Sequence, residues 1–107
     1  MERSELIRRF VLNSICDDYE NVDQRILQEV SRDAAKYGWT IARAEIVAAL
    51  VWLVENGMAK AYTLSGVEPH AIEFQGMPRL DVIEENFKTY FHITKKGMDL
   101  HLSDDEP

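Results

Sequence analysis

The residues best placed for chemistry are cations that recur along one predicted helix. Arg25, Arg32 and Lys36 are seven and four residues apart, so they share one face of that helix. Guanidinium and ammonium groups spaced in this way can contact the phosphates of a nucleic-acid backbone. Glu29 lies four residues after Arg25, however, and the alternative is a solvated face with local ion pairs.

Two further polar residues lie near the start of the next predicted helix. The side chains of Thr40 and Arg43 could reach the donor and acceptor edges of base pairs, which base reading requires. The candidate contacts for double-stranded DNA are therefore Arg25, Arg32, Lys36, Thr40 and Arg43.

Catalytic and metal-binding patterns are absent from the sequence. It has no glycine-rich phosphate loop, no nucleophile elbow, and no HExxH or CxxC spacing. The histidines are scattered, and nothing fixes a third metal ligand beside His92 and His101. Cys16 lies among the apolar residues of the first helix, where it is better explained as a small core residue than as a nucleophile. We therefore expect no enzymatic activity, no metal and no cofactor.

Composition and charge narrow the class of protein. A chain of 107 residues, with 46% hydrophobic and 29% charged residues, is typical of one domain that builds its own core. The formal net charge of −7 repels phosphate and anionic lipid on average, although it is compatible with a local basic patch. The single cysteine and the lack of a signal-peptide pattern or membrane-length apolar run predict a cytoplasmic protein without membrane contact.

Hydrophobic periodicity predicts three helices in the first half of the chain. The first lies within residues 2–16. The second extends from an N-cap at Asn21 to a left-handed stop at Gly38. We expect Thr40 to cap the third helix and Gly57 to end it.

Two strands and a long insertion follow these helices. Residues 58–64 and 87–93 alternate as strands do, and we expect them to pair antiparallel. The insertion at 65–86 is too long for a tight hairpin, but its apolar residues should anchor it to the body. Within it, "HAIEFQ" alternates like a strand, and Pro78 could begin a short helix through Glu85. A short helical turn then closes the fold, ahead of an acidic tail over 103–107.

Two segments resemble the winged helix-turn-helix domains of MarR-like and PadR-like transcriptional regulators. "AEIVAALVWLVENGMAKAY" is similar to their third helix and first wing strand, and "YFHITKKGMDL" to their second wing strand. The resemblance implies an α+β winged-helix domain over residues 1–102, with a three-helix core and an antiparallel β-hairpin wing that carries the long insertion. It also implies transcriptional regulation, reading of the major groove by the third helix, phosphate contacts from the wing, and dimerisation.

The sequence departs from this pattern on the two surfaces that would contact DNA, the third helix and the wing. The outward side of the third helix includes Ala44, Ala48, Val51 and Trp52. Alanine and valine can touch a thymine methyl group but discriminate little between bases. In the insertion, acidic side chains outnumber the single cation Arg79, whereas a wing that grips phosphates needs the reverse.

Several explanations of this apolar surface stay open. The insertion or the C-terminal segment could cover it, or a partner chain could, with Ala48, Val51 and Trp52 as the interface of a homodimer or of a complex with another protein. Alternatively, only the first turn, around Thr40 and Arg43, enters the groove. Two functional hypotheses follow: a dimeric transcriptional regulator that binds DNA, and a winged-helix protein-interaction module that does not read sequence.

Overall fold

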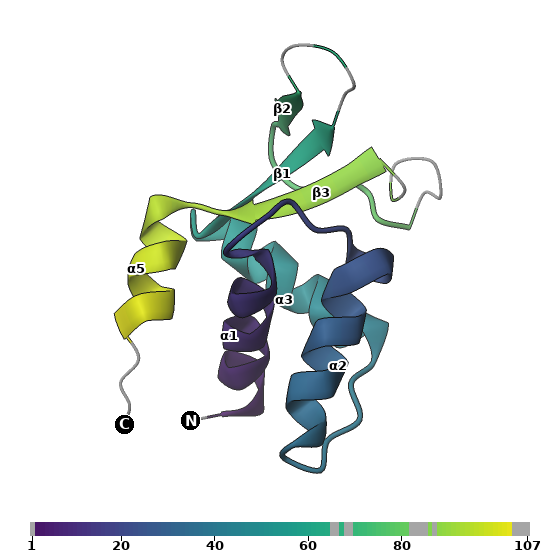
Figure 1. Ribbon diagram of the computed structural model, residues 1–107, viewed down its shortest axis with the longest axis vertical. Helices are drawn as coiled ribbons and strands as arrows, with labels where there is room; N and C mark the ends of the chain where they lie inside the picture. Colours follow the sequence, from purple (N-terminus) through teal and green to yellow (C-terminus); the bar gives the residue numbers. More distant parts are fainter. Residues whose placement is uncertain (1, 65–66, 68–69, 82–85, 87, 104–107) are drawn as a thin grey trace.

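The strands form a sheet at one end of the molecule, and three helices pack together beneath it (Figure 1). The computed structural model describes residues 2–64, 67, 70–81, 86 and 88–103. In chain order the described elements are α1 (Arg3–Ile15), a short π-helical segment η1 (Val22–Ile26), α2 (Leu27–Ala35), α3 (Arg43–Glu55), β1 (Ala59–Leu64), β2 (Ala71–Phe74), β3 (Thr89–Ile93) and α5 (Lys95–Ser103). The expected α+β class is therefore confirmed.

β1 is the central strand of the sheet, whose order is β2-β1-β3. The predicted antiparallel pairing of residues 58–64 with 87–93 is confirmed, and Ala61 lies opposite Phe91. On its other edge β1 pairs antiparallel with β2, which places Phe74 opposite Ala61 as well. The prediction of a two-stranded wing was therefore incomplete, because the alternating segment inside the insertion adds a third strand.

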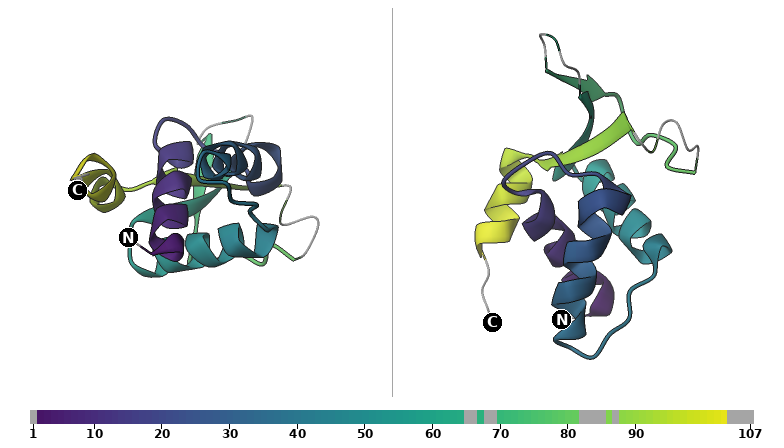
Figure 2. Two further views of the ribbon diagram at one scale, coloured as in Figure 1. Left: turned by 90° about the horizontal axis from the view of Figure 1, so that it is seen from below. Right: turned by 45° about the vertical axis from the view of Figure 1, so that its right-hand side comes forward.

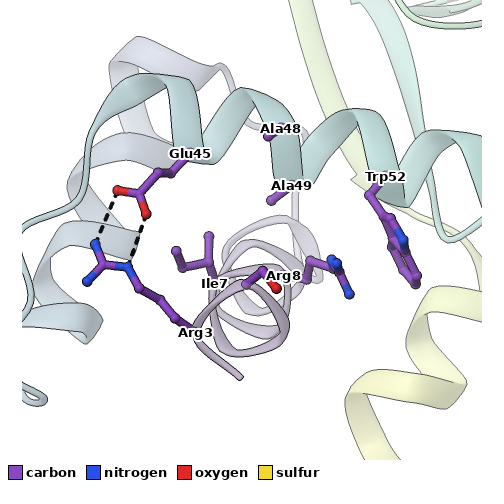
Figure 3. A pocket seen from close by; sticks show the side chains of 8 residues that line it. Arg3, Ile7, Arg8, Glu45, Ala48, Ala49 and Trp52 are labelled. Atoms are coloured by element: carbon purple, nitrogen blue, oxygen red, sulfur yellow. Dashed lines mark hydrogen bonds and ion pairs between the residues drawn. The ribbon is translucent and has the colours of Figure 1, made fainter. Parts of the chain in front are cut away.

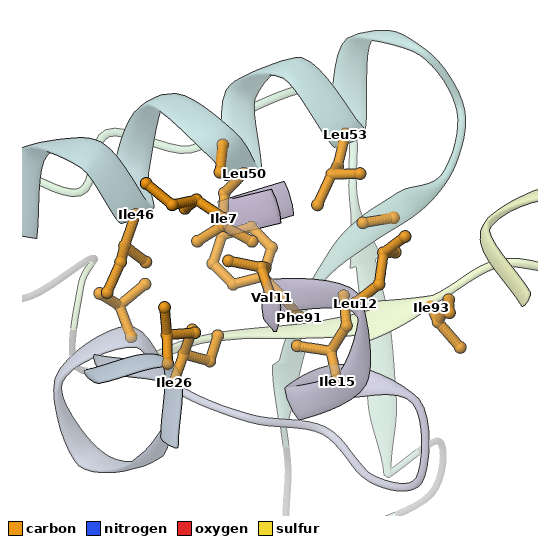
Figure 4. Packing of buried hydrophobic residues seen from close by; sticks show 14 of the residues in the cluster. Ile7, Val11, Leu12, Ile15, Ile26, Ile46, Leu50, Leu53, Phe91 and Ile93 are labelled. Atoms are coloured by element: carbon orange, nitrogen blue, oxygen red, sulfur yellow. The ribbon is translucent and has the colours of Figure 1, made fainter. Parts of the chain in front are cut away.

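The core lies where one face of this sheet meets the helices (Figure 4). Alternate residues of β3 point into it, since Phe91 and Ile93 are buried whereas Tyr90 and His92 are partly exposed. Burying a large apolar side chain of this kind contributes about 1.5–3 kcal/mol. The helical side of the core is built by Ile7, Val11, Leu12 and Ile15 of α1, Ile26 of η1, and Ile46, Leu50 and Leu53 of α3.

Asn21 joins the start of η1 to the sheet. Its Oδ1 accepts hydrogen bonds from two backbone N–H groups of η1, which confirms the predicted N-cap. Its Nδ2 donates to the carbonyl oxygens of Asn86 and Thr89, at 2.7 and 2.9 Å. Beside it, Glu20 and Phe91 exchange both backbone hydrogen bonds. The connection between α1 and η1 is thus fastened to β3.

The ends of the helices follow the sequence signals only in part. Gly38 and Gly57 adopt positive φ angles of 76° and 74°, as predicted for left-handed helix stops. The prediction that Thr40 caps α3 was wrong, because Ala42 is the N-cap residue. The carboxylate of Glu45 accepts the N–H of Ala42 at 3.1 Å, which is the half of a capping box that satisfies the N-cap residue itself.

Two C-terminal features complete the packing. α5 lies beside α1 and β3 (Figure 2). A Cβ at Gly97 would collide with the carbonyl oxygen of Met58, so glycine permits this close approach.

In the insertion, Pro78 and Leu80 are buried, and Leu80 joins the core, which confirms the expected packing on the body for this part. The short helix predicted from Pro78 to Glu85 was wrong for residues 78–81, which form a loop and a turn, and its second half lies outside the described residues, as does the tail after position 103.

Candidate functional site

Arg43, the charged candidate for base reading, is held by neighbouring side chains. Its guanidinium binds both carboxylate oxygens of Asp23, with Nε 2.8 Å from Oδ1 and Nη2 3.2 Å from Oδ2. The same Nη2 donates to Oδ1 of Asn86 at 3.2 Å. These contacts connect the first turn of α3 to η1 and to the segment before β3. Arg43 would have to leave this network to reach a base.

The network also shifts the pKa values of Asp23 and Arg43. The hydrogen bond from Arg43 lowers the pKa of Asp23 against the opposing effect of burial, and the same bond raises the pKa of Arg43. Both side chains are 38% exposed, so solvent screens the pair and its contribution is about 1 kcal/mol or less. Because the folded chain lowers the pKa of Asp23, this contribution is present at neutral pH and is lost as the pH falls through that lowered value.

Thr40 lies in the exposed loop before α3, next to the start of α1. Its carbonyl oxygen accepts a hydrogen bond of 2.8 Å from Nη2 of Arg3. Arg3 also donates to both carboxylate oxygens of Glu45, at 3.0 and 3.2 Å, and its guanidinium lies 4.9 Å from the ring centroid of Trp39. The loop that carries Thr40 is thus anchored to α1.

The other three predicted DNA contacts, Arg25, Arg32 and Lys36, line two different hollows. Arg25 and Arg32 line one hollow of about 470 Å³ on η1 and α2, and their side chains are 58% and 65% exposed. Both have acidic partners, since Arg25 binds Glu29 at 2.9 Å and Arg32 lies 3.5 Å from Asp33. Lys36, at the end of α2, lines a different hollow together with His101 and other residues. Arg25 and Arg32 therefore share one hollow and have local ion pairs, whereas Lys36 lines another hollow.

A groove of about 380 Å³ lies between α1 and α3, and we name it the α1–α3 groove (Figure 3). Two of the interface candidates, Ala48 and Trp52, line it. Ile7 and Ala49 make its floor apolar, and the Arg3–Glu45 ion pair lies at one end. The residues that line the groove are Arg3, Ser4, Ile7, Arg8, Glu45, Ala48, Ala49 and Trp52.

Arg8 is the cation of this groove. Its guanidinium carbon lies 4.1 Å from the centroid of the Trp52 ring, within the range of a cation–π contact. No carboxylate among the described residues forms an ion pair with it. A guanidinium that stacks through its face keeps the N–H donors at its edge available to an anion. The groove therefore offers an apolar floor beside an oriented cation.

The third interface candidate, Val51, lies on the other side of α3. It lines a hollow of about 500 Å³ together with Ala44, Val47 and Ala48 on α3 and residues 77–81 of the insertion. The insertion thus covers part of the outward side of α3, as one of the sequence explanations proposed. We name the outward residues Ala44, Ala48, Val51 and Trp52 the α3 outer face. Ala44 and Ala48 remain exposed, and Val51 and Trp52 are half-buried.

Sequence reasoning did not identify Arg3 and Arg8 as parts of this site. Arg3 meets Glu45 across 42 residues of sequence, and Arg8 stacks on Trp52 of another helix. No local signal encodes such a pairing, because it depends on how α1 and α3 are packed together. The sequence did, by contrast, point to Ala48 and Trp52 through the unusual apolar character of their helix.

Comparison of the chain with protein-family models, with curated proteins and with solved structures finds no match. None of the helices in the part of the chain that the structure describes has both the length and the hydropathy needed to cross a bilayer. The described histidine, cysteine and carboxylate side chains form no group of three that could hold a metal ion. Function is therefore inferred from the α1–α3 groove, the α3 outer face and the charges around them.

Proposed function

We propose that this chain is a winged-helix protein-interaction module that binds a partner through the α1–α3 groove and the α3 outer face, without reading DNA sequence. The order of three helices followed by an antiparallel sheet supports the winged-helix arrangement. The observation that carries the proposal is that α3 presents an apolar surface and has no free cation for DNA. Its one cation, Arg43, is held by Asp23 and Asn86, and its outer face is apolar.

The chemistry of the groove describes the partner that would fit it. An apolar side chain can fill the space above Ile7 and Ala49, where it would displace water from apolar surface. A carboxylate next to that side chain can accept hydrogen bonds from the N–H groups at the edge of the Arg8 guanidinium. A partner segment that alternates apolar and acidic residues along one helical face meets both requirements, in the manner of a helix bound in a groove.

Photo-cross-linking in the cells that produce the chain tests this proposal. We expect a photoreactive p-benzoylphenylalanine in place of the exposed Ala48 to give a protein adduct of one discrete mass. A Trp52→Glu substitution in the same chain should abolish the adduct, because it removes the ring that orients Arg8 and gives that cation a carboxylate partner within the chain.

The matched control places the same photoreactive residue at Gln28, which is exposed between Arg25 and Arg32. The proposal predicts no adduct at this position. A nucleic-acid adduct at Gln28, or the absence of any protein adduct at Ala48, would contradict it. Far-ultraviolet circular dichroism of each purified variant shows whether the fold is retained.

DNA binding is the second candidate function, and the surface of Arg25 and Arg32 is the observation that favours it. Both guanidinium groups are more than half exposed and line one hollow, so a phosphate could enter between them. A phosphate would have to compete with Glu29 and Asp33, which already occupy both cations. This candidate also has to overcome the net charge of −7, so it predicts binding that weakens steeply with salt.

A further inference from the structure

β2 is an edge strand with one open side. It pairs with β1 through residues Ala71–Phe74, and no other described strand lies beside it. The backbone N–H and C=O groups on the open side of an edge strand form a template for another strand. The opposite edge of the sheet is different, because the backbone of Phe91 in β3 is already paired with Glu20.

Exposed apolar side chains are concentrated on the hairpin of β1 and β2. Of the six large hydrophobic residues that are exposed in the described part of the chain, four lie here: Leu64, Val67, Ile72 and Phe74. Ile72 and Phe74 share the sheet face of Ala61 and Phe91, because residues opposite one another in antiparallel strands point to the same side. They extend the core face of the sheet beyond the helices, where no described element covers them fully.

The usual protections of an edge strand are missing from β2. It contains no proline and no lysine, and its backbone has no positive-φ residue within the strand. Its one charged side chain, Glu73, is paired with Lys60 of β1 at 3.3 Å. The strand therefore presents open backbone groups together with Ile72 and Phe74, and its one charged side chain lies on the opposite face of the sheet, paired with Lys60.

We propose that β2 pairs antiparallel with β2 of a second copy of this chain. A second copy brings an edge with the same open backbone groups, so each strand satisfies the other. Such a pair is closed by a two-fold axis. The Glu20–Phe91 pairing occupies the middle of the other edge of each sheet, which favours a pair over a longer assembly. DNA and anionic lipid fit this surface less well, since it is apolar and the chain carries a net charge of −7.

The symmetry also selects a register. In an antiparallel pair with a two-fold axis perpendicular to the sheet, the axis passes midway between one residue and its copy, which lie directly opposite each other. An axis at Glu73 would place two carboxylates directly opposite each other, which is unfavourable. An axis at Ile72 instead places the two Ile72 side chains together and Glu73 opposite Ala71 of the second copy. The proposal therefore takes Ile72 as the centre of the interface.

Disulfide cross-linking tests the register in the intact chain. We expect Ile72→Cys to form a covalent dimer rapidly under mild oxidation, because side chains directly opposite in an antiparallel pair are close enough for a disulfide. Glu73→Cys on the same strand is the matched control. It should cross-link at least about tenfold more slowly, because residue 73 faces residue 71 of the second copy and the two cysteines at position 73 would not lie opposite each other. The wild-type chain, whose one thiol is at Cys16, gives the background rate.

Light scattering tests the association without a new thiol. The wild-type chain should have twice its 12.4 kDa mass, and Ile72→Lys should have the mass of one chain. Ile72→Thr keeps a β-branched residue and should weaken association less than lysine does. Circular dichroism of each variant separates dissociation from unfolding. A single-chain mass for the wild type up to millimolar concentration, or equal cross-linking at positions 72 and 73, would overturn the proposal.

Discussion

Replacing Asn21 with aspartate should lower the free energy of unfolding by about 3–5 kcal/mol at neutral pH, as expected when a buried charge is left without a partner. Asn21 is 2% exposed, and its Nδ2 donates to two carbonyl oxygens, those of Asn86 and Thr89. A carboxylate in its place keeps the acceptor that caps η1 but turns a second acceptor toward those carbonyls. Such a loss is a large part of the total stability of a domain of this size, which is about 5–15 kcal/mol.

Urea unfolding of both proteins at several pH values measures this effect. The oxygens facing the introduced carboxyl should raise its pKa in the folded chain, so the deficit should narrow as the pH falls toward about 4 and the group becomes protonated. Asn13→Asp, which adds the same charge at an exposed position of α1, should change stability by less than about 1 kcal/mol. Equal losses for the two variants would show that Asn21 does not hold the connection to β3.

Phe91→Ala should cost about 3–5 kcal/mol, the range for truncating a fully buried aromatic residue. Phe91 is completely buried in the core, on the face of β3 that lies against α1 (Figure 4). Its backbone also pairs with Glu20, so the cavity would form beside the connection that Asn21 fastens. Thermal and urea unfolding, followed by circular dichroism, would measure the loss.

Tyr90→Ala is the control for this substitution, because Tyr90 precedes Phe91 on the same strand but is only half-buried on the opposite face. It should cost clearly less than Phe91→Ala. A similar loss at both positions would mean that the two faces of β3 contribute equally, and it would contradict the assignment of the core to the helical side of the sheet.

The elements could be predicted from the sequence where a local signal determined them. Asn21 caps the start of a helical segment with its own side chain, and Gly57 ends a helix by adopting a positive φ, so each acts at a single position. The alternation that predicts β1 and β3 depends only on neighbouring residues. Thr40 failed as a cap because α3 begins at Arg43, so the N-cap position falls on Ala42. The third strand was visible as an alternating segment, but its partner on β1 was not.

The site could be predicted less well, because its decisive contacts join distant segments. Arg43 appeared available for DNA as long as its partners were unknown. Asp23 lies 20 residues before it and Asn86 lies 43 residues after it, and only the packed fold brings them together. The apolar outward side of α3 was recognised correctly, whereas the division of its residues between the α1–α3 groove and the insertion required the structure.

Titration of a fluorescently labelled generic DNA duplex with the intact chain, at low and at physiological salt, tests the central claim most directly. Non-specific affinity for phosphate is the minimum that any DNA-reading domain shows, and low salt strengthens it. If α3 contacts protein, no binding should occur at either salt concentration. Binding that weakens steeply with salt would contradict the claim, and its loss in Arg43→Ala would place the first turn of α3 in the DNA groove.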